Sequence, residues 1–559
     1  MGIGRGSTVT DTIARESNHS DSFPSESMDA MMPARHASVT DNGRSLAMAV
    51  LLVAALLLAG CSALPPLKQQ TISAALTDTA DTRLGKAVHA YAEAQSDKSG
   101  IYGLEVPQDA FAARVLLARA AERSLDVQYY IWHSDTTGYL MLEEIWNAAE
   151  RGVRVRLLLD DNGIAGLDPI IAALDSHPNI EVRLFNPFVQ RSFKAFGYVT
   201  DFSRLNRRMH NKSFTADTQA TIVGGRNIGD EYFGAGEHMV FADLDVVAVG
   251  RIAAETAAAF DLYWASKSAY PAESIVGTAS TDRVQAMLAK FAAVHSSAAA
   301  VEYIEAVRST GLIQALIARN LRLEWARVRL VYDDPIKTLD KAQDADLLFT
   351  KMREAIGTPA RELDIISPYF VPGKQGTLAL SAFPERGVQL RILTNSLAAT
   401  DVGAVHAGYA KRREALLRSG ARIYELKPDY ARKDGNAKDK KKPDKGGSSS
   451  ASLHAKTFSV DRTLVFIGSF NLDPRSIHLN TEMGFVIESP RLANAVSSWL
   501  DHSVEGTAYE VIPARNGHGL EWIERTSEGE VYYSSEPKTG FWRRFGVGLM
   551  SLLPIEWLL

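Results

Sequence analysis

The chain has 559 residues, of which 46% are hydrophobic and 23% charged, and its formal net charge is −5. Such a composition is typical of a globular protein long enough for more than one domain with its own core. The slightly negative net charge argues against a protein that coats nucleic acid, although a local basic patch could still bind anions. A single cysteine, Cys61, excludes any intrachain disulfide.

The N-terminal segment ends in a pattern typical of an export signal. An apolar run over 46–59 follows Arg44 and is closed by Gly60 and Cys61, which is the form of a bacterial lipoprotein signal. We therefore expect Cys61 to become an acylated N-terminus and the protein to be a membrane-associated lipoprotein of the bacterial envelope. The alternative is an uncleaved anchor, although about 14 apolar residues fall short of the ~20 that span a bilayer. Residues 1–44 are polar and unpatterned, so we expect them to be disordered or absent from the mature protein.

Helical and strand patterns alternate after residue 100. Apolar spacing predicts helices over 109–123 and 140–151, strands over 125–131 and 153–159, and a further helix from Asp168. Alternation of this kind predicts an α/β fold with a mixed, largely parallel sheet and helices on both faces.

A compact polar motif follows: His210, Lys212 and Asp217, and then Gly224-Gly225-x-Asn227. In an extended strand alternate side chains share a face, so an imidazole and an ammonium project together. This pair suits an anionic phosphate. The ranges 210–217 and 221–225 read as two extended segments that turn near Asp217, which would return Asn227 towards the imidazole.

The same motif recurs as His454, Lys456 and Asp461, followed by Gly468-Ser469-x-Asn471 with identical spacing. Outside the motifs, residues 150–158 (ERGVRVRLL) recur as 385–393 (ERGVQLRIL). Nearly constant offsets between repeats indicate two copies of one domain. We expect residues 268–322, which have no counterpart, to bridge the two halves.

We place the domain boundaries as follows: a leader at 1–61, a first domain with an N-terminal extension and the helical bridge at 62–300, a second domain at 301–515, and a C-terminal extension at 516–559. The lysine-rich insertion at 431–451 is expected to be a solvated loop beside the site, either without a role or holding anionic head groups. The terminal residues 541–559 mix aromatics, arginines and leucines, and they either dock on a lipid interface or pack back on the catalytic domains.

The paired motifs resemble those of the phospholipase D superfamily. Further stretches, among them 125–135 (LDVQYYIWHSD) and 452–489, are similar to bacterial cardiolipin synthases of the C type, and the resemblance covers roughly 100–559. It implies a phosphatidyl transfer that makes cardiolipin from phosphatidylglycerol and a second phospholipid, with phosphatidylethanolamine expected. It also implies a membrane surface as partner and metal independence. No cofactor and no nucleic acid are expected, and a protein activator stays open.

The two histidines and two lysines suffice for phosphodiester chemistry without a metal. Lys212 and Lys456 can neutralise the phosphate and the charge that builds on it. We expect His210 to attack phosphorus, forming a phosphohistidine, and His454 to protonate the departing alcohol and deprotonate the incoming one.

Further polar residues are expected to support these four. An acidic side chain downstream of each motif, Asp243 in the first half and Glu482 in the second, is placed to hold an imidazole in one tautomer. Asn227 and Asn471 can donate amide hydrogens to phosphate oxygens. Asp217 and Asp461 belong to the motifs, but their position at turns is equally compatible with a structural role.

Aromatic residues at strand ends, Tyr129, Tyr130, Trp132, Tyr369 and Phe370, either pack in the core or line a lipid pocket. His406 and Tyr409 lie in a stretch that resembles cardiolipin synthases, and a plain helix surface is the alternative. Three rival functions stay open: a hydrolase of the phospholipase D type, a nuclease of the same superfamily, and an envelope lipid-binding protein without activity.

Overall fold

The structure, a computed structural model, describes residues 64–67, 70–235, 240–429, 451–554 and 556–559. These residues belong to one compact unit, 63–559. Cys61 and the basic insertion up to residue 450 lie outside the described residues, so the predictions made for them stay predictions.

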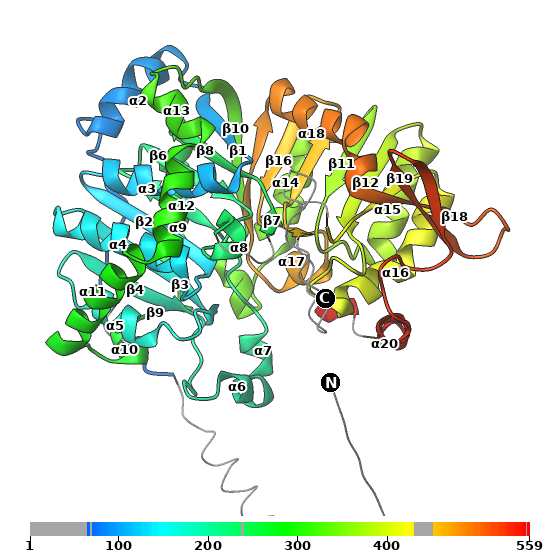
Figure 1. Cartoon of the computed structure of the whole chain (residues 1–559). Coiled ribbons are helices and arrows are strands. Elements are labelled where there is room, and N and C mark those ends of the chain that lie inside the picture. The colour runs from blue at the N-terminus through cyan, green and yellow to red at the C-terminus, as the bar shows by residue number, and fades with distance from the viewer. Residues whose placement is uncertain (1–63, 68–69, 236–239, 430–450, 555) are drawn as a thin grey trace, which may run out of the picture. The chain divides into compact units, whose positions relative to one another are not determined.

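The first half forms a mixed sheet in the spatial order β9–β4–β3–β2–β5–β6–β8–β1 (Figure 1). Its strands are β1 (Ser99–Leu104), β2 (Ser124–Ile131), β3 (Arg154–Gly163), β4 (Ile180–Phe185), β5 (Ser213–Ala216), β6 (Ala220–Gly224), β8 (Asp245–Gly250) and β9 (Ala269–Pro271).

The second half repeats this order as β18–β13–β12–β11–β15–β16–β17–β10 and adds β19 and β20 beyond β18. Its strands are β10 (Glu324–Tyr332), β11 (Glu362–Ile366), β12 (Gln389–Asn395), β13 (Arg422–Leu426), β15 (Thr457–Val460), β16 (Leu464–Gly468), β17 (Met483–Glu488), β18 (Ala508–Pro513), β19 (Leu520–Thr526) and β20 (Gly529–Tyr533). The first strands of the two halves pair antiparallel, with Ile101 opposite Glu324, so one sheet runs through both halves.

The prediction of a mixed sheet is confirmed, but the prediction that it is mostly parallel is wrong. Parallel pairing joins β2, β3 and β4, whereas the other neighbours in the first half run antiparallel. Parallel strands need a long crossover, which α4 (Thr136–Glu150) and α5 (Asp168–Asp175) supply. The motif segment has no such helix. It folds as a hairpin through Asp217 and Thr218, whose φ angles are 51° and 57°.

Helices cover both faces of the sheet, as predicted. In β3, Leu157 and Leu159 belong to the core under α3 (Pro107–Ala120) and α4, whereas Leu158 packs with α9 (Arg251–Trp264). Since neighbouring residues of a strand face opposite sides, both faces are apolar and covered. In the second half the corresponding helices include α14 (Leu348–Ile356), α15 (Gly373–Glu385), α16 (Gly403–Arg418) and α18 (Pro490–His502).

The bridging segment is helical and packs on the first half. It comprises α11 (Thr281–His295), α12 (Ala298–Arg308) and α13 (Gly311–Ile317), and Ala300, Tyr303 and Leu312 are buried in the first core. The boundary drawn at residue 300 therefore falls inside α12. By packing, the change of halves comes just before β10.

The C-terminal residues pack on the second half rather than standing apart. Beyond β20, α20 (Phe541–Ser551) lies against α16 through Val547 and Met550 (Figure 1). None of the helices in the described ranges combines the length and the apolar character that a membrane crossing requires.

Candidate active site

Each motif histidine is docked by its backbone on the opposite half. The amide of His210 donates to Thr481 O at 2.8 Å, and the amide of His454 donates to Ala242 O at 2.8 Å. In the second case the contact continues a short parallel pair between β7 (Val240–Ala242) and β14 (Ala451–Leu453). The residue after each acceptor is a carboxylate, Glu482 or Asp243.

The two imidazoles consequently pair across the halves. His210 Nδ1 lies 2.8 Å from Glu482 Oε2, and His454 Nδ1 lies 2.6 Å from Asp243 Oδ2. Both predicted carboxylates contact an imidazole, but each holds the histidine of the other half. Chain order could not assign the partners, because it does not reveal which strands meet at the interface. Engagement of Nδ1 leaves each Nε2 available for chemistry.

Both lysines are buried beside the histidines. Lys212 Nζ donates to His210 O at 2.6 Å, and Lys456 Nζ donates to His454 O. Burial lowers the pKa of Lys212 well below its usual range and that of Lys456 to about 8. A buried cation is costly unless it meets an anion, so an incoming phosphate would stabilise both ammonium groups.

The two histidine–carboxylate pairs differ in charge. Burial, together with Lys212 and Lys456, holds the pKa of His210 well below its usual value, so its imidazole is neutral at neutral pH. Burial raises the pKa of its partner Glu482 to about 7. At Asp243 burial acts in the same direction, but His454, Lys456 and Arg226 outweigh it and hold the pKa at about 2. Asp243 is therefore ionised beside His454, whose own pKa is lowered by burial and by Lys456.

The surroundings of the two carboxylates also differ at one equivalent motif position. Ser469 Oγ donates to Glu482, and Ser476 Oγ adds a second hydrogen bond at 3.0 Å. The equivalent of Ser469 is Gly225, where a Cβ atom would lie 2.2 Å from Asp243 Oδ1. Glycine is thus required for the close approach of Asp243. Neither role was predicted, although the contrast between the two motif tails was visible in the sequence.

The two asparagines are buried near the histidines. Asn227 Nδ2 donates to the Tyr232 hydroxyl at 3.0 Å, and its Oδ1 accepts from the Ile131 amide at 3.2 Å. Asn471 Oδ1 is buried and finds no hydrogen-bond partner among the described residues. Phosphate binding by either amide stays a prediction.

The motif aspartates face away from the imidazoles and bind backbone amides. Asp217 accepts from the amides of Glu122, Arg123 and Ser124, and Asp461 accepts from those of Ala360, Arg361 and Glu362. Each carboxylate therefore ties its hairpin turn to the start of β2 or β11. Of the two roles considered, this geometry favours the structural one.

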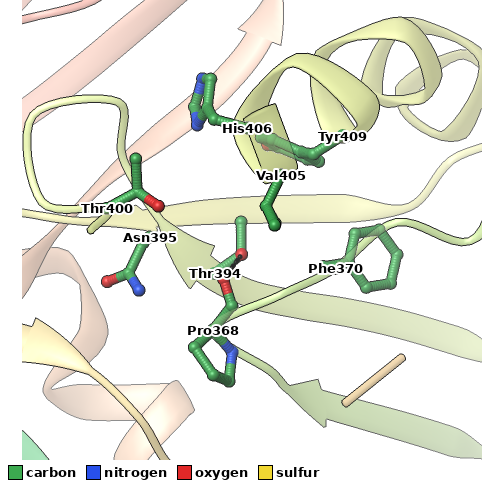
Figure 2. A pocket seen from close by; sticks show the side chains of 8 residues that line it. All are labelled: Pro368, Phe370, Thr394, Asn395, Thr400, Val405, His406 and Tyr409. Carbon is green, nitrogen blue, oxygen red and sulfur yellow. Dashed lines mark hydrogen bonds between the residues drawn. The ribbon is translucent and has the colours of Figure 1, made fainter. Parts of the chain in front are cut away.

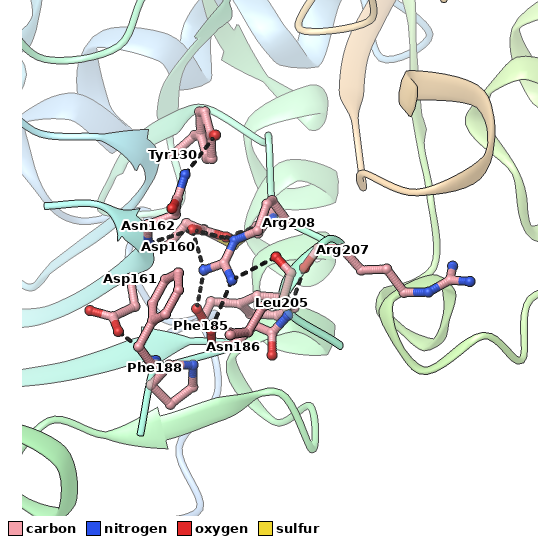
Figure 3. A network of polar contacts seen from close by, with 12 residues as sticks. Tyr130, Asp160, Asp161, Asn162, Phe185, Asn186, Phe188, Leu205, Arg207 and Arg208 are labelled. Carbon is pink, nitrogen blue, oxygen red and sulfur yellow. Dashed lines mark hydrogen bonds and ion pairs between the residues drawn. The ribbon is translucent and has the colours of Figure 1, made fainter. Parts of the chain in front are cut away.

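A buried network that was not predicted fixes the segment before His210 (Figure 3). Asp160 accepts from the Arg208 guanidinium at 2.9 Å and from the Met209 amide at 2.8 Å. Tyr130 accepts from Asn162 at 3.2 Å, and its ring meets the His210 ring edge-on at 5.0 Å. The repeat offset of 385 − 150 = 235 leads from Asp160 to Asn395, which makes the equivalent contact with the Leu453 amide at 2.9 Å.

Asn395 also lines a small pocket of the second half (Figure 2). His406 and Tyr409 line it from α16, together with Phe370 and Thr394. Both are buried, with His406 Nε2 3.1 Å from Glu536 and the Tyr409 hydroxyl 2.9 Å from Glu425, so the helix-surface alternative is wrong. Tyr129, Trp132 and Phe370 are fully buried, whereas Tyr130 and Tyr369 are half-buried.

Two groups in the described part of the chain have metal-ligand composition, and spacing in the sequence revealed neither: His133, Asp135 and Glu231, and His406, Glu425 and Glu536. In the second group Arg413 pairs with Glu425 at 3.0 Å and Glu536 at 2.7 Å. In the first, Asp135 caps α4 by accepting from the Gly138 amide at 2.9 Å. The side chains of both groups thus already have partners within the protein.

Comparison with known proteins agrees with this geometry. A family model described as "Cardiolipin synthase, PLD-like domain" matches residues 116–264 and 352–504, one match in each half. The chain is 48% identical to cardiolipin synthase C of Escherichia coli K12 over 85% of its own length and 100% of that protein. It is 25% identical to cardiolipin synthase A of Pseudomonas entomophila, over 74% of this chain and 70% of the relative.

A solved structure shares the fold. The crystal structure of phosphatidylserine synthase from Haemophilus influenzae aligns with a TM-score of 0.51 over 85% of this chain and 100% of that one, at 14% identity. At that identity the likeness concerns the arrangement of the two halves alone.

Proposed function

Because this chain belongs to the family of phospholipase D-like cardiolipin synthases and is a phosphatidyltransferase, we propose that it makes cardiolipin from phosphatidylglycerol and a second phospholipid through a phosphohistidine. Phosphatidylethanolamine is the second substrate that we propose. The observation that carries the mechanism is the crossed pair of histidine–carboxylate contacts, with a buried lysine beside each imidazole.

In the first step Nε2 of His210 attacks phosphorus, an N–P bond forms and the bond from phosphorus to the head-group oxygen breaks. His454 gives its proton to that oxygen, and a free alcohol leaves. Lys212 and Lys456 compensate the charge on the non-bridging oxygens. In the second step a glycerol hydroxyl of the other lipid gives its proton to His454 and attacks phosphorus, which breaks the N–P bond and restores His210.

The difference between the two pairs supports this division of roles. A nucleophile must be neutral, and His210 has the more strongly lowered pKa and a partner whose pKa is raised to about 7. A proton carrier must pass through the imidazolium state, and the ionised Asp243 beside His454 stabilises that cation.

Trapping the intermediate tests the mechanism. With an activated substrate that releases p-nitrophenolate, the leaving group needs no proton, so His454→Ala should retain a burst and accumulate an acid-labile phosphorus adduct. His210→Ala should give neither burst nor adduct. The reverse result would exchange the two roles, and substantial cardiolipin synthesis by the double variant would refute the mechanism. Product analysis with both lipids distinguishes transfer, which yields cardiolipin, from hydrolysis, which yields phosphatidic acid.

We also propose that Cys61 is acylated and anchors the enzyme in the bacterial envelope. Labelled palmitate should enter the wild-type protein and fail to enter Cys61→Ala, whereas equal labelling of both would refute the anchor.

Deletion of 431–450 should weaken binding to anionic vesicles at low salt, because each basic residue near such a surface contributes about 1 kcal/mol.

A further inference from the structure

Two apolar segments that lie far apart in the sequence remain exposed. Around α6 (Lys194–Thr200) and α7 (Phe202–Leu205) the exposed side chains are Phe193, Val199 and Phe202, and on α20 they are Phe541, Trp542, Phe545 and Leu549. Trp542 and Val199 each keep 79% of their surface exposed. Since α20 packs on α16 through Val547 and Met550, its aromatic side is left without a partner among the described residues. Exposed apolar groups gathered in this way mark an interaction surface.

Arg475 connects the two segments. Its guanidinium donates to Asn206 O at 3.0 Å and Asn206 Oδ1 at 2.7 Å, directly after α7, and to Leu558 O at 3.0 Å near the C-terminus. Its amide donates to Leu559 O at 2.7 Å. Asn206 and Arg475 lie four residues before His210 and four after Asn471, so the apolar segments flank the active site from both halves. Figure 1 shows α6, α7 and α20 along the same lower edge.

The charge on α20 complements an anionic surface. Arg543 donates to Thr400 O at 3.1 Å and Arg544 to Thr539 O, and within the described ranges neither guanidinium pairs with a carboxylate. A short helix that combines exposed Trp and Phe side chains with unpaired arginines is typical of segments that lie in the membrane interface.

The start of the described chain reaches the same place. Gln70 donates to Ala269 O. The amide of Asn186 donates to the carbonyl of the adjacent Ser268 at 2.6 Å, and Asn186 Nδ2 donates to Arg204 O in α7 at 2.8 Å. Gln70 is 70 − 61 = 9 residues from Cys61, a reach of at most about 30 Å.

We propose that α6, α7 and α20 form one docking surface, here called the rim surface, which seats the enzyme on a bilayer of anionic phospholipid. The rim surface deepens the proposed function and rests on it, because the substrates would reach the histidines from the bilayer between the two apolar segments.

Local fluorescence tests the rim surface without requiring activity. Because Cys61 is the only cysteine in the sequence, a full-length Cys61→Ala chain with Leu549→Cys or Val199→Cys takes one environment-sensitive label. Vesicles of phosphatidylglycerol and phosphatidylethanolamine should shift the emission of both labels to the blue and raise it roughly twofold. A label at Ile317→Cys, on α13 and equally exposed to solvent, should not change. Vesicles of phosphatidylcholine alone should give a weaker response at Leu549→Cys.

If neither label responds although the protein sediments with the vesicles, the proposal is overturned. The two apolar segments would then be assigned to a protein partner. A response at one label only would overturn the two-part surface.

Replacement of Phe541, Trp542 and Phe545 by Ser should lower turnover of vesicle-borne phosphatidylglycerol on the order of tenfold and leave turnover of a dispersed short-chain analogue within about twofold. The control Tyr91→Ser, Val301→Ser, Ile317→Ser should change neither rate. If the wild type turns over neither substrate, the proposed function fails, while the fluorescence still decides on the rim surface.

Discussion

At the scale of single residues, the two motif histidines are chemically equivalent but have different surroundings. The motifs supply the same imidazole and ammonium twice, yet a longer carboxylate with two serine hydroxyls holds His210 and a shorter, ionised one holds His454. An attacking group and a proton carrier need different protonation states. Burial and the two lysines keep His210 neutral, and the ionised Asp243 lies beside His454. Gly225 leaves the space that Asp243 occupies beside His454.

The lysines predict the pH dependence. The pKa of Lys456 is lowered to about 8, and that of Lys212 also lies well below its usual range, so raising the pH through about 8 removes the positive charge that binds phosphate. We expect kcat/KM to fall above pH 8, roughly tenfold per unit. On the acid side, the lowered pKa keeps His210 neutral below pH 6.5. Protonation of this nucleophile should therefore not reduce kcat/KM just below that pH. A kcat/KM that stays level up to pH 10 would contradict the burial argument.

We expect the Gly225→Ala variant to lose catalytic activity without unfolding. The added Cβ would lie 2.2 Å from Asp243 Oδ1, so the carboxylate must move and release His454. We expect kcat to fall on the order of 10²–10⁴-fold, the usual contribution of a positioned acid and base. Gly311→Ala is the matched control, since a Cβ there meets nothing within 4 Å. Wild-type kcat in Gly225→Ala would show that Asp243 does not orient the imidazole.

At the scale of elements, the motif hairpins are held by their aspartates. Asp461 and Arg462 have φ angles of 51° and 55°, a left-handed pair that forms a tight turn, and the carboxylate binds the three amides that lead into β11. The identical spacing from histidine to aspartate in the two motifs thus reflects the length of one strand and its turn.

Asp461→Ala should therefore cost stability rather than chemistry. Loss of an acceptor for three amides should lower the free energy of unfolding by about 1–3 kcal/mol. Asp461→Asn, which keeps one oxygen and tolerates the left-handed φ, should lose less. Urea unfolding measures both, and kcat measured well below the transition should stay within a few-fold of wild type. A loss of kcat comparable to that of His454→Ala would restore a catalytic role to Asp461.

Most elements could be predicted because their signals are local. The helix over 140–151 and the strand over 125–131 follow from periodicity, and the repeated motif fixes two equivalent halves. The predicted share of parallel strand pairs is too high, because hairpins and crossover connections give a similar alternation of helix and strand patterns in the sequence. The partners of His210 and His454 could not be predicted, because Thr481 and Ala242 meet them only across the interface of the halves.

At the scale of the whole molecule, the two halves are joined both along the sheet and at the active site. β1 and β10 make the sheet continuous, and the histidines cross to the carboxylates of the opposite half. Neither half contains both members of either motif pair, His210–Glu482 or His454–Asp243. Docking of the halves therefore creates the two imidazole environments, and folding of the interface and assembly of the site are one event.

Double-mutant cycles on stability test this crossing. For residues in contact the effects of two substitutions deviate from additivity by roughly 0.5–3 kcal/mol. Glu482→Gln should couple in this range with His210→Ala and more weakly with His454→Ala, and Asp243→Asn should show the opposite preference, because the contacts of 2.8 Å and 2.6 Å join opposite halves. Each same-half combination is the control for the crossed one and uses the same substitutions. Stronger coupling within a half than across the halves would mean that each carboxylate serves its own motif, and the interface would then no longer account for the difference between the two histidines.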